Sequence, residues 1–128
     1  MPGYDAVLFE PPAPLARVTF RNPATGSTWS EVPMLLDSGA DVTLVPQAAA
    51  GRVGATVVPD RQYELVGFGG GRSFAPVTQL ELIFLGRTFR GQFLLLDQEW
   101  GILERNVLNA VSLILDGPHF LWDELRPG

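Results

Sequence analysis

Short apolar runs separated by glycine and proline recur along this chain of 128 residues. The 14 glycines and 11 prolines divide the sequence at intervals typical of strands joined by turns, which predicts an all-β fold. The expected strands are residues 15–20, 28–36, 56–58, 63–66, 73–77, 80–85, 88–96, 113–115 and 120–122.

Turn residues and prolines set further expectations. Gly86-Arg87 predicts a tight hairpin turn, and Pro33 predicts an edge or bulged position because proline cannot donate to a strand ladder. Helix is expected only as a turn at 46–50 and as a short helix at 106–111. Residues 1–14 are proline-rich and predict an extended arm, followed by a single domain at 15–128 without internal repeats.

Missing residue types exclude several kinds of chemistry. Without cysteine or lysine, the chain has no thiolate nucleophile, thiolate metal site, Schiff-base amine or P-loop lysine. The single histidine, His119, lies in a predicted turn, which favours a surface position over a Ser-His-Asp triad. We therefore expect no metal and no cofactor, and any catalysis must come from carboxylates.

Charge and hydropathy indicate the setting. The net charge of -5 argues against a nucleic-acid partner. No apolar run approaches the roughly 18 residues of a membrane span, and the first residues lack signal-peptide features, so a cytoplasmic setting away from membranes is expected. Hydrophobic residues make up 46% of the chain, which suggests that a partner subunit covers part of its surface.

The residues around Asp37-Ser38-Gly39 are of the kind expected near a catalytic carboxylate. The apolar residues 34–36 deliver the aspartate from a buried strand, and Gly39 permits a tight turn before the chain returns to the core at 40–46. The tripeptide alone is a weak signal, since roughly one unrelated chain in twenty of this length contains it by chance. A polar turn after a core strand is the alternative.

The run from Leu35 to Thr43, the later glycine-rich segment and the run from Ile102 to Leu108 together resemble the retropepsin family of retroviral-type aspartic peptidases. The resemblance covers roughly residues 15–117 in order and spacing. It implies a closed, barrel-like β subunit with one short helix and a flap hairpin, paired as a C2 homodimer. It also implies hydrolysis of a peptide or protein substrate between two Asp37 carboxylates, one from each subunit.

Such a dyad uses an ionised aspartate to activate water and a protonated one to donate to the scissile carbonyl. Two like charges about 3 Å apart cannot both ionise, so the pKa values belong to the pair. One motif per chain requires a second chain, which an isologous interface supplies. By resemblance, Ser38 braces the two loops across the axis and Gly39 presents backbone groups to substrate. The resemblance further assigns substrate binding to Ala40, Asp41, Val66, Gly67, Phe68, Gly69 and Gly70, and structural support to Arg105 in an ion pair with Asp41.

The glycine tip at 67–71 lies within an expected hairpin arm at 63–74. Glycine bends easily and lets backbone approach a peptide, and the resemblance implies a flap that covers substrate. A phosphate-binding loop is a competing interpretation, but it needs a helix after the glycines, where 74–77 has strand character. A plain surface loop is the other alternative, although Phe68 at an exposed tip favours a functional contact.

One residue departs from the family pattern. Glu104 stands where the family has glycine, and an unpaired buried carboxylate there is costly. Glu104 is therefore expected to face solvent or a ligand, unless the backbone bends differently. The departure favours a second hypothesis, a catalytically silent dimer that binds peptide or protein. A third hypothesis is an unrelated small β-barrel that acts as a binding module.

Overall fold

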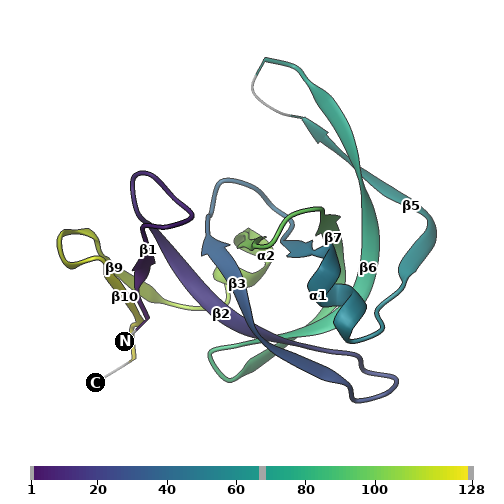
Figure 1. The fold of residues 1–128 in the computed structure, drawn as a ribbon, viewed down its shortest axis with the longest axis horizontal. Helices are drawn as coiled ribbons and strands as arrows, with labels where there is room; N and C mark the ends of the chain where they lie inside the picture. The colour runs from purple at the N-terminus through teal and green to yellow at the C-terminus, as the bar shows by residue number, and fades with distance from the viewer. Residues whose placement is uncertain (1, 67–68, 127–128) are drawn as a thin grey trace.

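The structure, a computed structural model, describes residues 2–66 and 69–126. Strands dominate these residues, and their helices are short (Figure 1). The strands are β1 (Tyr4–Asp5), β2 (Ala13–Arg21), β3 (Thr28–Leu36), β4 (Leu44–Pro46), β5 (Val57–Val66), β6 (Arg72–Phe84), β7 (Arg87–Leu96), β8 (Gly101–Leu103), β9 (Leu113–Asp116) and β10 (Leu121–Glu124). The helices are α1 (Gln47–Arg52), α2 (Arg105–Leu108) and the 3-10 helix η1 (Gly117–His119).

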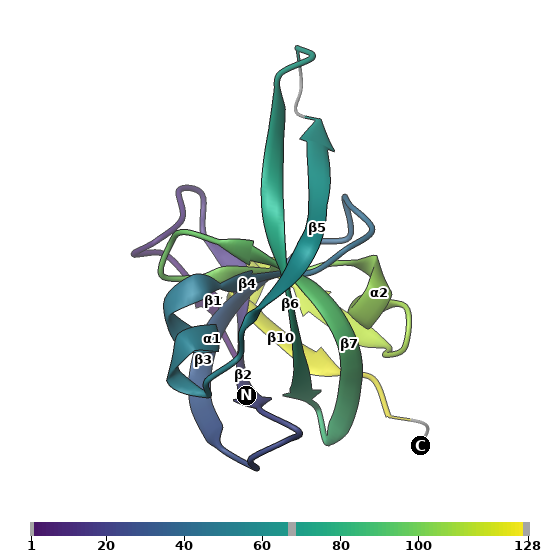
Figure 2. The same cartoon turned by 90° about the vertical axis from the view of Figure 1, so that its right-hand side faces the viewer.

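Pairing between strands closes a barrel. Hydrogen bonds join the strands in the order β1-β2-β3-β8-β4-β7-β6-β5, and β2 pairs a second time with β6. The ring β2-β3-β8-β4-β7-β6 is therefore continuous, which confirms the expected closed, all-β architecture. The hairpin of β5 and β6 rises beyond this barrel at the end where β3 finishes (Figure 1, Figure 2).

Two groups of buried apolar side chains fill the molecule. Inward-facing residues alternate along the strands because successive side chains point to opposite faces. The main core takes Ala16, Val18 and Phe20 from β2 in this way, and Val32 and Met34 from β3. A second, smaller cluster lies at the base of the β5–β6 hairpin and consists of Leu44, Ala75, Val77 and Leu94.

β8 lies between the two strands that flank the Asp37 loop. It pairs in parallel with β3, where Leu35 faces Ile102, and antiparallel with β4, where Leu44 faces Ile102. Gly101 is the first residue of β8, and the space around its Cα atom is too small for a side chain. A Cβ atom there would lie 2.5 Å from the Leu44 carbonyl oxygen and 2.5 Å from Sδ of Met34. Glycine at 101 therefore allows β8 to enter between β3 and β4.

Some element boundaries differ from the sequence prediction. Pro59-Asp60 does not end a strand, because β5 continues through it with a shift of register and Asp60 takes a φ of 59°. β6 is likewise one strand across 78–79, since Thr78 is buried and its hydroxyl donates to the Thr56 carbonyl oxygen over 2.9 Å. β1 and β8 were not expected, because strands of two and three residues carry no periodic pattern of their own.

The helices also differ from expectation. The fold prediction contained one short helix, whereas the structure has α1 as well as α2, because the expected turn at 46–50 extends into a six-residue helix. α2 begins at Arg105 and ends at Leu108, earlier than the expected end at 111. Beyond it the chain continues in tighter turns, in which the Ala110 N–H donates to the Val107 carbonyl oxygen.

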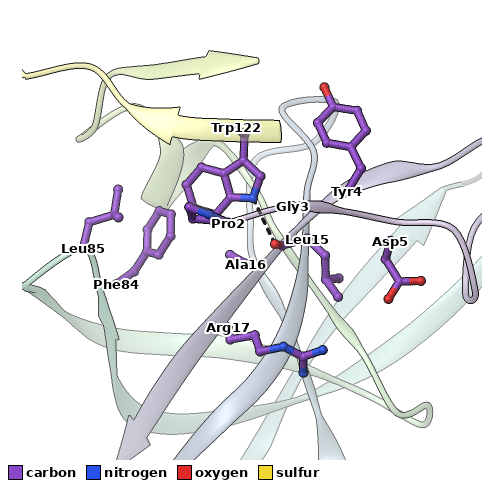
Figure 3. A pocket seen from close by; sticks show the side chains of 10 residues that line it. All are labelled: Pro2, Gly3, Tyr4, Asp5, Leu15, Ala16, Arg17, Phe84, Leu85 and Trp122. Atoms are coloured by element: carbon purple, nitrogen blue, oxygen red, sulfur yellow. Dashed lines mark hydrogen bonds between the residues drawn. The ribbon is translucent and has the colours of Figure 1, made fainter. Parts of the chain in front are cut away.

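The strands expected at 113–115 and 120–122 correspond to β9 and β10, which pair antiparallel as a hairpin near the C-terminus. Trp122 on β10 is buried, and its indole N–H donates to the Leu15 carbonyl oxygen over 3.0 Å (Figure 3). Tyr4 pairs with Pro14, and its N–H donates to the Phe120 carbonyl oxygen. A cavity of about 440 Å³ lies among these elements, and none of its lining residues belongs to the Asp37 loop.

Candidate active site

The loop between β3 and β4, residues 37–43, carries the Asp-Ser-Gly run. Asp37 follows β3 directly, and its N–H donates to the Leu103 carbonyl oxygen over 3.0 Å. This bond continues the parallel ladder of β3 with β8, in which Leu36 faces Leu103. The sheet therefore fixes the start of the loop, while residues 37–41 are exposed.

The Asp37 carboxylate is oriented by its own loop. The Gly39 N–H donates to Oδ1 of Asp37 over 2.8 Å. A Cβ atom on residue 39 would lie 3.0 Å from the same oxygen, so a larger residue would crowd the carboxylate. Oδ2 takes no part in this bond. An exposed, oriented carboxylate of this kind is suited to proton transfer with a water or a substrate.

Thr43 fixes the other end of the loop. Its side chain is fully buried, and its hydroxyl accepts the Glu104 N–H over 3.0 Å and donates to Oδ1 of Asn106 over 2.6 Å. The Asn106 N–H in turn donates to the Asp41 carbonyl oxygen over 3.2 Å. The junction of β8 and α2 therefore holds the loop at several points.

Glu104 is buried behind the loop, with 2% of its surface exposed. Its Oε2 accepts the Ala40 N–H over 2.8 Å. Burial raises the pKa of Glu104, the Ala40 N–H opposes that rise, and the negative charge of Asp37 adds to it. The expectation that this carboxylate faces solvent is wrong, because it turns inward to a partner that the loop itself provides.

Arg105 also contacts the loop, although in a different way from that expected. Its backbone N–H and its Nε–H both donate to the Ala40 carbonyl oxygen, over 3.2 Å and 2.8 Å. Among the described residues, no ion pair joins Asp41 to Arg105. The ion pair implied by the resemblance is thus replaced by two bonds to the loop backbone.

Of the remaining candidate residues, the structure describes Val66, Gly69 and Gly70, which lie at the end of the β5–β6 hairpin. Val66 ends β5 with 68% of its surface exposed. Gly69 and Gly70 follow with φ values of 89° and 82°, a conformation that favours glycine. Gly67 and Phe68 lie outside the described residues. In the part of the chain that the structure covers, no hydrogen bond joins this hairpin end to the Asp37 loop.

Apolar packing connects the loop to the base of the hairpin. Val42 from the loop, Leu65 from β5 and Ile102 from β8 are partly buried and pack against the second cluster. One side of each therefore contacts the core, while the rest of its surface is accessible. Here these three partly exposed apolar side chains, one each from the loop, β5 and β8, are called the apolar surface beside the loop.

Sequence reasoning assigned a supporting role to Arg105 by resemblance but missed the other residues that hold the loop. Thr43 and Asn106 were not assigned roles, and Gly101 lies outside all the expected strands. The available signal was one hydroxyl inside the otherwise apolar run from Val42 to Pro46, since a buried polar side chain needs a partner. The identity of that partner depends on the fold.

Other kinds of site find little support. No group of three or more potential metal ligands occurs within residues 2–66 and 69–126. His119 is exposed, as expected, and its Nδ1 lies 2.8 Å from Oδ2 of Asp116. In the described ranges, no helix has the length and apolar character that crossing a bilayer requires.

Comparison with solved structures identifies a related fold. The chain is similar to EIAV protease, a retroviral protease solved in complex with the inhibitor HBY-793, with a TM-score of 0.54 and 24% sequence identity. The match covers 77% of this chain and 86% of that chain. No family model and no curated protein matches the sequence. The fold is thus shared with a retroviral protease, at low sequence identity.

Proposed function

We propose that this chain is one subunit of a homodimeric aspartic peptidase, in which Asp37 supplies one of two catalytic carboxylates. The observation that carries the proposal is the Asp37 loop itself. Its carboxylate is exposed and oriented by the Gly39 N–H, and the loop is anchored to Leu103 at the end of β8. The fold shared with a retroviral protease supports the same function.

The proposed reaction uses one Asp37 from each subunit. The ionised carboxylate takes a proton from a water molecule while the oxygen of that water attacks the scissile carbonyl carbon. The protonated carboxyl of the other Asp37 donates its proton to the carbonyl oxygen. Transfer of a proton to the amide nitrogen then allows the C–N bond to break. Ser38, exposed beside Asp37, is the proposed brace between the two loops across the dimer axis.

The substrate is proposed to be an extended peptide with apolar side chains. The β5–β6 hairpin acts as the flap, and Val66, Gly69 and Gly70 at its end cover the bound chain. Ala40 and Asp41 contact the peptide from the opposite side. The apolar surface of Val42, Leu65 and Ile102 beside the loop favours apolar substrate side chains, since burying them releases water from both partners.

A second copy of the chain is the proposed partner. Large apolar side chains are exposed on and beside the β9–β10 hairpin, with fractions of 48% for Ile114, 57% for Leu115 and 53% for Phe120. Large apolar side chains exposed in one region of the chain favour burial against another subunit. Covering it with another subunit also accounts for the high hydrophobic content of the chain. The cytoplasmic setting stays a prediction.

Asp37→Asn tests the proposed chemistry. The substitution keeps the acceptor for the Gly39 N–H and removes the general base, so kcat for an apolar peptide at acidic pH should fall by about 10²- to 10⁴-fold or more. Asp97→Asn is the matched control, because it removes one exposed carboxylate outside the loop. Unchanged hydrolysis in Asp37→Asn would refute the proposal.

Mixing the wild-type chain with Asp37→Asn tests the need for two carboxylates. After subunit exchange at constant total protein and equal amounts, about one quarter of the wild-type activity should remain, whereas independent monomers would leave about half. Sedimentation equilibrium of both proteins provides the oligomeric state.

The second candidate function, which Glu104 favours, is a catalytically silent dimer that binds peptide. Such a dimer would bind both peptide and a pepstatin-type inhibitor without hydrolysing the peptide.

A further inference from the structure

Two consecutive backbone amides of the Asp37 loop bind two different carboxylates. The Gly39 N–H donates to Asp37, and the next N–H along the chain, that of Ala40, donates to Glu104; both bonds measure 2.8 Å. Asp37 belongs to the loop, whereas Glu104 comes from the junction of β8 and α2, 64 residues after Ala40. The two acids are therefore linked through one short stretch of backbone.

That stretch has little freedom to move independently of Glu104. The carbonyl oxygen of Ala40 accepts two bonds from Arg105, so Ala40 is fixed on both its N–H side and its C=O side. Rotation of the peptide unit between Gly39 and Ala40 would disturb the Gly39 amide as well. Since that amide orients Oδ1 of Asp37, a change at Glu104 reaches Asp37 through adjoining covalent and hydrogen bonds.

We propose that Glu104 is a positioning residue whose ionised carboxylate, acting through the Ala40 amide, sets the orientation of the Asp37 carboxylate and makes it dependent on the proton held by Glu104. The effect on catalysis rests on the proposed peptidase function, whereas the bond to Ala40 and its dependence on protonation do not. Glu104 itself touches neither water nor substrate in this role.

Protonation weakens this support because a neutral carboxyl is a poorer acceptor than a carboxylate. Burial raises the pKa of Glu104, so its proton is retained at higher pH than on an exposed glutamate. The charged groups that face it are Asp37 and Asp41 from the loop, which favour the proton, and Arg105 from α2, which opposes it. Its other polar neighbours, the Ala40 amide and Thr43, do not titrate.

The amide proton of Ala40 reports on Glu104 directly in a pH titration of the full chain by NMR. In the wild type its chemical shift should follow a single titration with a midpoint above that of exposed glutamates. Glu104→Gln keeps an oxygen that can accept the N–H, and in this variant the titration should vanish. Asp37→Asn should keep the titration and lower its midpoint, because it removes one neighbouring negative charge.

Two outcomes would overturn the proposal. One is an Ala40 shift that does not titrate in the wild type. The other is a titration that persists unchanged in Glu104→Gln. If that variant fails to fold, the shift in midpoint between the wild type and Asp37→Asn decides the question, since an unmoved midpoint would mean that another group is titrating.

Activity provides a second readout. Glu104→Ala should lower kcat by about 10- to 100-fold, the loss expected for a misplaced catalytic group, with little change in KM. Glu104→Gln should recover most of that loss and alter the pH profile of kcat, whereas Glu99→Gln, at an exposed glutamate, should change neither. Equal kcat in all three would contradict the positioning role. If Asp37→Asn retains activity, the peptidase function fails, and the NMR titration still tests Glu104.

Discussion

Gly101→Ala is expected to destabilise the protein at the point where β8 enters between β3 and β4. The added Cβ would lie 2.5 Å from the Leu44 carbonyl oxygen, 2.5 Å from Sδ of Met34 and 2.8 Å from Cδ of Pro46. Contacts below 3.0 Å require a movement of the neighbours. None moves easily, because one is backbone, one belongs to a proline ring and Met34 is fully buried.

The size of the effect follows from the cost of overpacking. Extra methyl groups in packed cores cost about 1–3 kcal/mol, and three simultaneous clashes place this substitution at the upper end, at about 3 kcal/mol. That is a large share of the roughly 5–15 kcal/mol that stabilises an ordinary domain. Displacement of β8 also moves Leu103, the acceptor for the Asp37 N–H, so activity should fall together with stability.

Urea unfolding measures this loss as a decrease in the free energy of unfolding at an unchanged slope. Gly51→Ala is the matched control, because Gly51 lies in α1 and a Cβ there meets nothing within 4 Å. Alanine in a helix should stabilise the protein by about 0.5–1 kcal/mol. If the free energy of unfolding of Gly101→Ala lies within about 0.5 kcal/mol of the wild-type value, the close packing around residue 101 does not limit stability as argued.

Substitutions at three further residues test other parts of the structure. The Arg21 guanidinium beside Glu81 holds the pKa of this buried carboxyl below its ordinary range, so its charge stabilises the fold above that range and ceases to do so as pH falls through the lowered pKa. Glu81→Gln should therefore lower stability at neutral pH and match the wild type in strong acid, as followed by urea unfolding across pH. Thr43→Val removes the acceptor of the buried Glu104 N–H and should cost about 1–3 kcal/mol in the same assay, whereas Thr43→Ser, which keeps the hydroxyl, should cost less. Trp122→Phe loses the indole bond to β2 and should lower the thermal midpoint by several degrees, at about 4 °C for each kcal/mol in a domain of this size; an unchanged midpoint would contradict its role.

The fold could be predicted where local pattern carries the information. β3 has the predicted bounds of 28–36, and Pro33 is tolerated there because the second ladder, with β8, begins only at Met34. Prediction failed at Pro59-Asp60, because proline marks a strand end in most sequences, whereas the positive φ of Asp60 allows β5 to continue as a bulged strand.

The residues of the candidate site likewise fall into those that local sequence indicates and those that depend on contacts across the fold. Asp37 could be found from the apolar strand before it and the glycine after it, because both lie within a few residues. Apart from Arg105, which the resemblance indicated, its supports could not be found, since the acceptor of the Ala40 amide is 64 residues away and only the closed barrel places it there. The inward turn of Glu104 depends on that long-range arrangement as well.

The position of β8 in the chain also sets the order in which the loop can take shape during synthesis. A nascent chain that ends before residue 101 already contains β3 and β4, but the strand that belongs between them does not yet exist. Contacts across such long separations form slowly, because much of the chain must be ordered first. The bonds from Glu104, Arg105 and Asn106 to the Asp37 loop can therefore form only after these residues have been synthesised. Shorter translation products carry the Asp-Ser-Gly run without the hydrogen bonds that fix it.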